Sequence, residues 1–117
     1  MNRVVLWVYL VVVFVHGLIH LMGVAEGWGL ADFEQLTEPV SGGMAVLWLA
    51  AALSVVTAAG MTAVRAQGWW LVTAAAAVVS QVAIMTSWSD ASVGTAPNIV
   101  MIVAAGYGYA TWGRARP

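Results

Sequence analysis

Four long apolar runs, separated by three short polar segments, dominate the pattern of hydrophobic and polar positions along the chain. They predict helices over residues 4–25, 44–64, 69–89 and 97–112. A helix needs about 20 apolar residues to cross the roughly 30 Å hydrocarbon core of a bilayer. Three runs have that length, and the shorter fourth run reaches it with interfacial residues at its ends. The pattern therefore predicts one all-α domain over residues 1–117, an integral membrane antiparallel four-helix bundle.

The composition of the chain supports this class of protein. Its 117 residues are 62% hydrophobic and only 8% charged, whereas a soluble domain is about 25% charged. The chain contains no cysteine, which excludes disulfides, thiolate metal sites and iron–sulfur clusters. The formal net charge is −1, and without a basic patch we expect the lipid bilayer, and no nucleic acid, as a partner.

The charged residues divide between the two sides of the predicted bundle. Every cation lies in the N-terminal segment, the second loop or the C-terminal segment, and every acid lies in the other two loops. The positive-inside rule therefore places both termini in the cytoplasm. The cations are Arg3, Arg65, Arg114 and Arg116, and the acids are Glu26, Asp32, Glu34, Glu38 and Asp90.

The seven tryptophans lie near the predicted ends of the helices. Tryptophan is enriched at both membrane–water interfaces, so we expect two aromatic belts. The inner belt would hold Trp7, Trp69, Trp70 and Trp112, and the outer belt Trp28, Trp48 and Trp88.

The only two histidines, His16 and His20, lie one helical turn apart in the apolar stretch "VHGLIHLMG". Ionisable residues inside a membrane cost free energy and are candidates for function. His16 lies about 18 Å from the inner edge of the first helix at 1.5 Å per residue. Gln81 lies at a similar depth in the third helix, which runs in the same direction.

These depths predict a polar pocket in the outer half of the bundle. The third helix also carries polar and aromatic residues level with or above His20, and the start of the fourth helix lies near the mouth of the pocket. The predicted ligand-binding residues are His16, His20, Gln81, Ser87, Trp88 and Asn98.

Several roles remain open for the histidine pair. Neutral imidazoles can simply tie helices together by hydrogen bonds. Histidines at positions i and i+4 can also chelate a divalent metal, with Asp90 or a glutamate of a loop completing the site. Haem is less favoured, because two imidazoles on one side of a helix cannot approach an iron from opposite faces. A proton-titrating or quinone-binding site is the remaining alternative.

Four stretches of the chain resemble a known family. "HGLIHLMG", "VLWLAAAL", "WWLVTAAAAVVSQVAI" and "WSDASVGTAPNIV" together are similar to an uncharacterised family of small bacterial four-span membrane proteins. The wider shape is similar to that of the DoxX-like four-helix proteins, several of which act as membrane partners of redox systems. The resemblance implies a multi-pass protein of the bacterial cytoplasmic (inner) membrane.

The chain lacks the short motifs of common enzymes. It has no nucleophile elbow, no phosphate-binding glycine loop and no HExxH. We expect a non-catalytic binding or accessory module, acting alone, as a homo-oligomer or beside a partner membrane subunit. The alternative is a redox- or transport-associated subunit that uses the histidines for proton or electron transfer.

Overall fold

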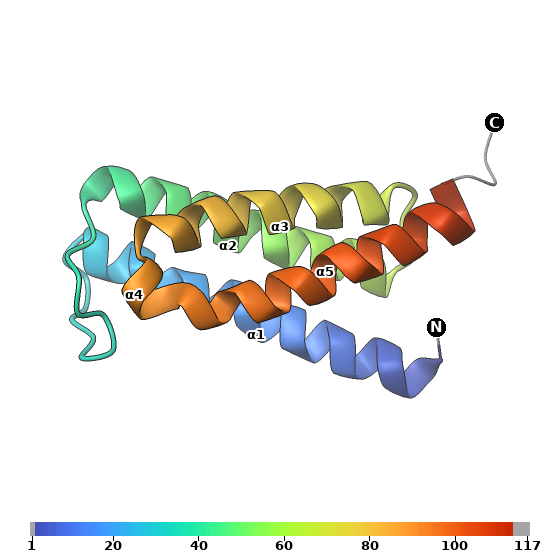
Figure 1. Ribbon diagram of the computed structural model, residues 1–117, viewed down its shortest axis with the longest axis horizontal. Coiled ribbons are helices and arrows are strands. Elements are labelled where there is room, and N and C mark those ends of the chain that lie inside the picture. The colour runs from blue at the N-terminus through green and yellow to red at the C-terminus, as the bar shows by residue number, and fades with distance from the viewer. Residues whose placement is uncertain (1, 114–117) are drawn as a thin grey trace.

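The computed structural model describes residues 2–113, and every regular element in that range is helical (Figure 1). Helix α1 spans Arg3–Gly27, α2 spans Gly42–Ala63 and α3 spans Trp69–Thr86. A fourth helical segment consists of α4 (Trp88–Ala91), the 3-10 turn η1 (Ser92–Gly94), α5 (Thr95–Gly108) and the π-helical turn η2 (Tyr109–Gly113). The predicted all-α class with four long helices is confirmed. Arg114 and Arg116 lie outside the described residues.

Local sequence signals define the starts of the helices. The side chain of Asn2 accepts a hydrogen bond from the backbone N–H of Val5, at 2.9 Å, and so caps α1. The Ser41 hydroxyl accepts one from the N–H of Met44, at 3.1 Å, and caps α2. Such caps satisfy N–H groups that the first helical turn leaves without partners. The turn into α3 ends at Gly68, whose φ of 78° favours glycine.

The junction between the third and fourth helical segments differs from the prediction. Helix α3 ends at Thr86 rather than at residue 89, and the segment predicted as a loop, residues 90–96, is helical. Ser87, with φ −136° and ψ 47°, interrupts the helix. The N–H groups of Asp90 and Ala91 then donate to the Ser87 carbonyl and start a new turn. The polar residues of this segment resemble a loop in sequence, but their backbone is helical, and the side chains of Asp90 and Thr95 find partners on other elements.

The helices pack in chain order and leave one side of the bundle open. Helix α1 packs along α2, α2 along α3, and α3 along α5, whereas α1 and α5 meet only weakly. Figure 1 shows the start of α1 and the end of α5 diverging from one another. The open side of the bundle therefore lies between the first and last helices.

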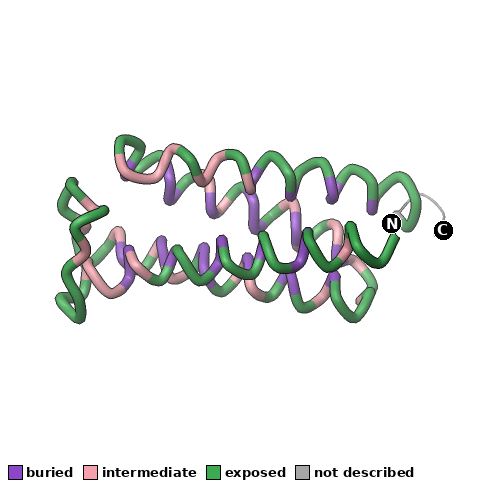
Figure 2. The backbone as a smooth tube through the Cα atoms, turned by 90° about the horizontal axis from the view of Figure 1, so that it is seen from below, coloured by how far each residue is buried: buried purple, intermediate pink, exposed green. Residues whose placement is uncertain are grey.

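Small side chains fill the interior of the bundle. Figure 2 shows the buried residues as a stripe on each long helix, with exposed positions over the remaining surface. Alanine dominates the buried set, and close helix approach in lipid relies on such small residues. The fully buried alanines are Ala45, Ala51, Ala76 and Ala83, each with no exposed surface.

Large apolar side chains instead cover the outer surface. Val4 is 72% exposed, Leu53 60% and Val103 67%, and similar residues cover every long helix. The buried set is mainly apolar as well, with a few polar side chains, so the outer surface is what differs from that of a soluble domain. Among the described residues, four helical segments are long and apolar enough to cross a membrane. The fourth, Trp88–Trp112, is 25 residues long and exceeds the predicted 97–112.

Two of the seven tryptophans are buried between helices. Trp48 and Trp69 are only 6% and 5% exposed. The predicted belts concern depth in a membrane, so they stay a prediction for these two residues. Trp48 is buried because Gly23 of α1 leaves room for its ring, since a Cβ at Gly23 would lie 2.6 Å from Trp48 Cγ.

A glycine substitution tests how closely α1 approaches α2. A Cβ at Gly17 would lie 2.8 Å from Val56 Cγ2, whereas a Cβ at Gly106 would meet nothing within 4 Å. We expect Gly17→Ala to lower the free energy of unfolding by about 1–2 kcal/mol, because valine cannot easily move aside. Gly106→Ala is the matched control and should be neutral or stabilising. Thermal unfolding in detergent measures both, and equal stability of the two variants would contradict the close approach.

Candidate functional site

The two histidines lie on the buried face of α1. His16 is 5% exposed and His20 is 2% exposed, because positions i and i+4 share one side of a helix. Their rings meet edge to face with centroids 4.5 Å apart. The His20 ring also meets the indole of Trp48 on α2, at a centroid distance of 5.2 Å.

The hydrogen bonds of His20 define the position of its ring hydrogen. Its Nδ1 lies 2.7 Å from the backbone oxygen of His16. A carbonyl oxygen only accepts, so Nδ1 carries the hydrogen and donates. Nε2 of His20 lies 2.7 Å from Ser80 Oγ on α3. In the neutral ring this nitrogen is an acceptor, and the Ser80 hydroxyl donates to it.

His16 has the opposite arrangement of its ring hydrogen. Its Nε2 lies 2.8 Å from Asn98 Oδ1 on α5 and 3.2 Å from Ser80 Oγ. The amide oxygen of Asn98 only accepts, so Nε2 of His16 carries the hydrogen. With both rings neutral, each of these contacts has one donor and one acceptor.

Two amides extend the network away from the histidines. Asn98 Nδ2 donates to Gln81 Oε1 at 2.9 Å, and Gln81 Nε2 donates to Thr95 Oγ1 at 3.0 Å. The network thus joins α1, α3 and α5 through side chains alone. Each polar group gains a partner, which removes most of the free-energy cost of burying it.

The structure places the predicted site residues in three different positions. His16, His20, Gln81 and Asn98 belong to this network. Ser87 is 1% exposed and lies outside the network, and Trp88 is half exposed. Sequence reasoning missed Ser80, which contacts both histidines. Its spacing was a usable signal, because Thr73, Ser80 and Ser87 recur every seven residues and are all buried.

The structure does not assemble the predicted metal ligands. Among residues 2–113, no three side chains of His, Cys, Asp or Glu lie together so that they could hold a metal ion. Both ring nitrogens of His20 already take part in hydrogen bonds. The carboxylate of Asp90 instead accepts hydrogen bonds from the Thr37 hydroxyl and from the N–H of Glu38, the latter at 2.8 Å.

These contacts of Asp90 hold the loop between α1 and α2 against α4. The Ser89 hydroxyl adds a further bond by donating to the Glu38 carboxylate. At the other end of the loop, Glu26 Oε2 accepts from the N–H of Phe33 at 2.9 Å. The loop therefore forms a strap across one end of the bundle.

A cleft of about 730 Å³ lies beneath this strap and extends along the open side of the bundle. Its long wall is the α1 face from Val11 to Gly23, and the opposite wall comes from α4, η1 and the start of α5. Most lining side chains are apolar, and His16, His20, Ser87 and Trp48 are also part of the lining. Clefts of this size and character commonly bind small organic molecules. Gln81, Asn98 and Trp88 are not among the lining residues.

Two of the described lining residues carry buried polar atoms that have no partner within residues 2–113. These atoms are Ser87 Oγ and Trp48 Nε1. The buried hydroxyls of Thr62 and Thr73 bond back to a carbonyl four residues earlier, and that of Ser80 donates to His20. Ser87 lies at the break after α3, where its backbone is not helical. It therefore cannot form the same bond, and an unpaired buried group costs about 1–3 kcal/mol.

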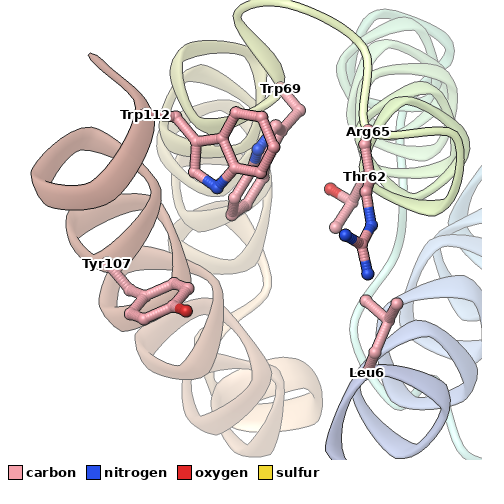
Figure 3. A pocket seen from close by; sticks show the side chains of 6 residues that line it. All are labelled: Leu6, Thr62, Arg65, Trp69, Tyr107 and Trp112. Carbon is pink, nitrogen blue, oxygen red and sulfur yellow. The ribbon is translucent and has the colours of Figure 1, made fainter. Parts of the chain in front are cut away.

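A second pocket, of about 110 Å³, lies at the opposite end of the bundle (Figure 3). Figure 3 shows Tyr107 and Trp112 of the last helical segment on one side and Arg65 with Leu6 on the other. Thr62 lines this pocket too, but its hydroxyl donates to Ala58 O at 2.8 Å. The larger cleft is the one that adjoins the buried histidine network.

Comparison of the chain with family models, curated proteins and solved structures found no match.

The network predicts the ring tautomers. We expect His16 to carry its hydrogen on Nε2 and His20 on Nδ1, both neutral at pH 7, because only this assignment gives every contact a donor and an acceptor. Nitrogen-15 NMR of histidine-labelled protein distinguishes the two tautomers and the charged ring. His20→Asn supplies the assignment control, since it removes one set of signals. An imidazolium at either position, or two rings of the same tautomer, would contradict the network.

Proposed function

We propose that the chain is an integral membrane protein of a bacterial cytoplasmic membrane, crosses the bilayer four times and has both termini in the cytoplasm. We further propose that it is a non-catalytic binding or accessory module whose cleft beside His16 and His20 holds a small ligand. The single observation that carries the binding role is the cleft of about 730 Å³ beside a satisfied polar network.

The apolar outer surface supports the proposed insertion. Four helical segments of sufficient length carry large apolar residues outward, among them Val8, Leu71 and Ile99, each 59% exposed. In water such a surface would cost about 25 cal/mol for each Å² of apolar area. In a bilayer these side chains contact lipid tails, so that cost disappears. The polar residues of the network are already buried inside the bundle.

The charge distribution supports the proposed orientation. Arg3 begins α1 and Arg65 lies in the turn between α2 and α3, so both lie at one end of the bundle (Figure 1). Glu38 and Asp90 meet at the other end. Cytoplasmic segments carry an excess of arginine and lysine, which makes the arginine end the proposed cytoplasmic side.

Details of the network favour binding over proton transfer. Both nitrogens of His20 are held in hydrogen bonds, and His16 connects onward through the amides of Asn98 and Gln81. Amide groups do not release their hydrogens near neutral pH, so this branch fixes the rings in place rather than carrying protons. The lining of the cleft, in contrast, is suited to hold an apolar molecule.

Single-cysteine labelling tests the orientation, and the chain has no native cysteine to remove. We expect Glu34→Cys, in the strap, to react with a membrane-impermeant maleimide in intact cells. Gln67→Cys, in the turn between α2 and α3, should react only after the cells are opened. Both positions are exposed. Labelling of Gln67→Cys in intact cells would contradict the proposed topology.

Blocking the cleft tests the binding role. Ile19 lines the cleft, whereas the adjacent Leu18 does not, and both are on the surface of α1. We expect the protein purified from its membrane to retain a small molecule detectable by mass spectrometry of an organic extract. Ile19→Trp should reduce the retained amount by at least about tenfold, because a bulky ring occupies part of a site built for another molecule. Leu18→Trp is the matched control and should retain it. Equal retention by the two variants would contradict the proposal that the cleft holds the molecule.

A further inference from the structure

We propose that the ligand of the cleft is an uncharged, lipid-soluble molecule that presents a carbonyl oxygen to Ser87 and Trp48 and enters sideways from the bilayer. This inference rests on the proposed function, since it names the chemistry of the molecule that the cleft would hold.

The unpaired polar atoms define the polar end of the ligand. The indole N–H of Trp48 can only donate, and the Ser87 hydroxyl can donate as well as accept. Neither atom has a partner among the described residues, and both residues line the cleft. A carbonyl oxygen has two lone pairs and accepts both hydrogens, which compensates the cost of burying them.

The charges around the cleft exclude an ionised ligand. No lysine or arginine is among its described lining residues, so an anion such as a carboxylate or phosphate would find no counter-charge. Within the described part of the chain, Asp90 is the only acidic lining residue, and its oxygens already accept from Thr37 and Glu38. A cation would meet the indole N–H of Trp48, which repels positive charge. An uncharged molecule suits this lining best.

The remaining lining describes the body of the ligand. Along α1 the cleft extends from Val11 to Gly23, about 18 Å at 1.5 Å per residue. Val11, Val15 and Ile19 of this wall are 58%, 46% and 54% exposed. Because α1 and α5 meet only weakly, these side chains face outward between the two helices. A long apolar tail can therefore enter from the hydrocarbon region without crossing water.

Two kinds of membrane molecule share this chemistry, namely an acylglycerol with its ester carbonyl and an isoprenoid quinone with its ring carbonyls. The test uses protein in phosphatidylcholine nanodiscs and a monoacylglycerol with a diazirine in its chain. A fatty acid with the same diazirine chain is the anionic control. Mass spectrometry locates the labelled residues after irradiation. Competition by monoolein or by decylubiquinone then identifies which source binds, and competition by either supports the proposal.

Removal of the unpaired Ser87 hydroxyl is the most specific test of the carbonyl contact. With Ser87→Ala, about tenfold more monoolein or decylubiquinone should be needed to compete with the probe for the cleft. That factor corresponds to the loss of roughly one hydrogen bond. The same variant should be as stable as the parent or more stable without probe, because it removes an unsatisfied buried group. A structural role for Ser87 would lower stability instead. Ser54→Ala is the control, since that hydroxyl bonds to Ala51 O within its own helix.

The outcomes separate this inference from the proposed function. Labelling of the cleft by the monoacylglycerol but not by the fatty acid, reduced by Ser87→Ala, supports both. Equal labelling by the two probes, or no effect of Ser87→Ala on competition, overturns the carbonyl chemistry while leaving the cleft as a binding site. Labelling that Ile19→Trp fails to reduce, or that spreads equally over the Leu18 face, overturns the cleft itself.

Discussion

The requirement that polar groups buried between apolar helices find partners is the constraint on which this structure depends. His16 meets it by donating to Asn98, and His20 by donating to a backbone oxygen and accepting from Ser80. The amide of Gln81 completes the branch toward Thr95. Because hydrogen bonds are directional, the network defines a single relative position of α1, α3 and α5. Apolar contacts alone are non-directional and leave more freedom.

Small residues bring helices that follow one another in the chain into close contact. Alanine and glycine permit close backbone approach of α1 to α2 and of α2 to α3. The hydrogen bonds of the network instead reach from α1 to α3 and α5 through side chains. The last helix, α5, in contrast meets α1 only weakly. The cleft is therefore a consequence of packing the helices in chain order, with three close interfaces and a fourth that stays open. Its lining includes Ser87 and Trp48, whose buried polar atoms the network does not reach.

Much of the fold was predictable from residue patterns, and the candidate site only in part. The apolar runs predicted the four long helices, because burial and hydrogen bonding of the backbone leave few alternatives for such sequences. Depth counting placed His16 level with Gln81, and the structure connects them through Asn98. Ser80 was missed because depth alone does not say which face of α3 meets α1. The burial of Trp48 was not predicted, because an indole near a helix end is suited equally to an interface and to a glycine-lined interior.

The sequence by itself determined the all-helical class, the approximate helix ends and the presence of two imidazoles in an apolar run. These follow from local and periodic properties that each segment carries alone. Tertiary structure decided the partners of those imidazoles, the hydrogen bonds that turn Asp90 away from them, and the break at Ser87 that leaves a hydroxyl unpaired. It also decided which side of the bundle stays open. Each of these depends on the rotation of one helix against another, and that rotation depends on the packing of residues far apart in the chain.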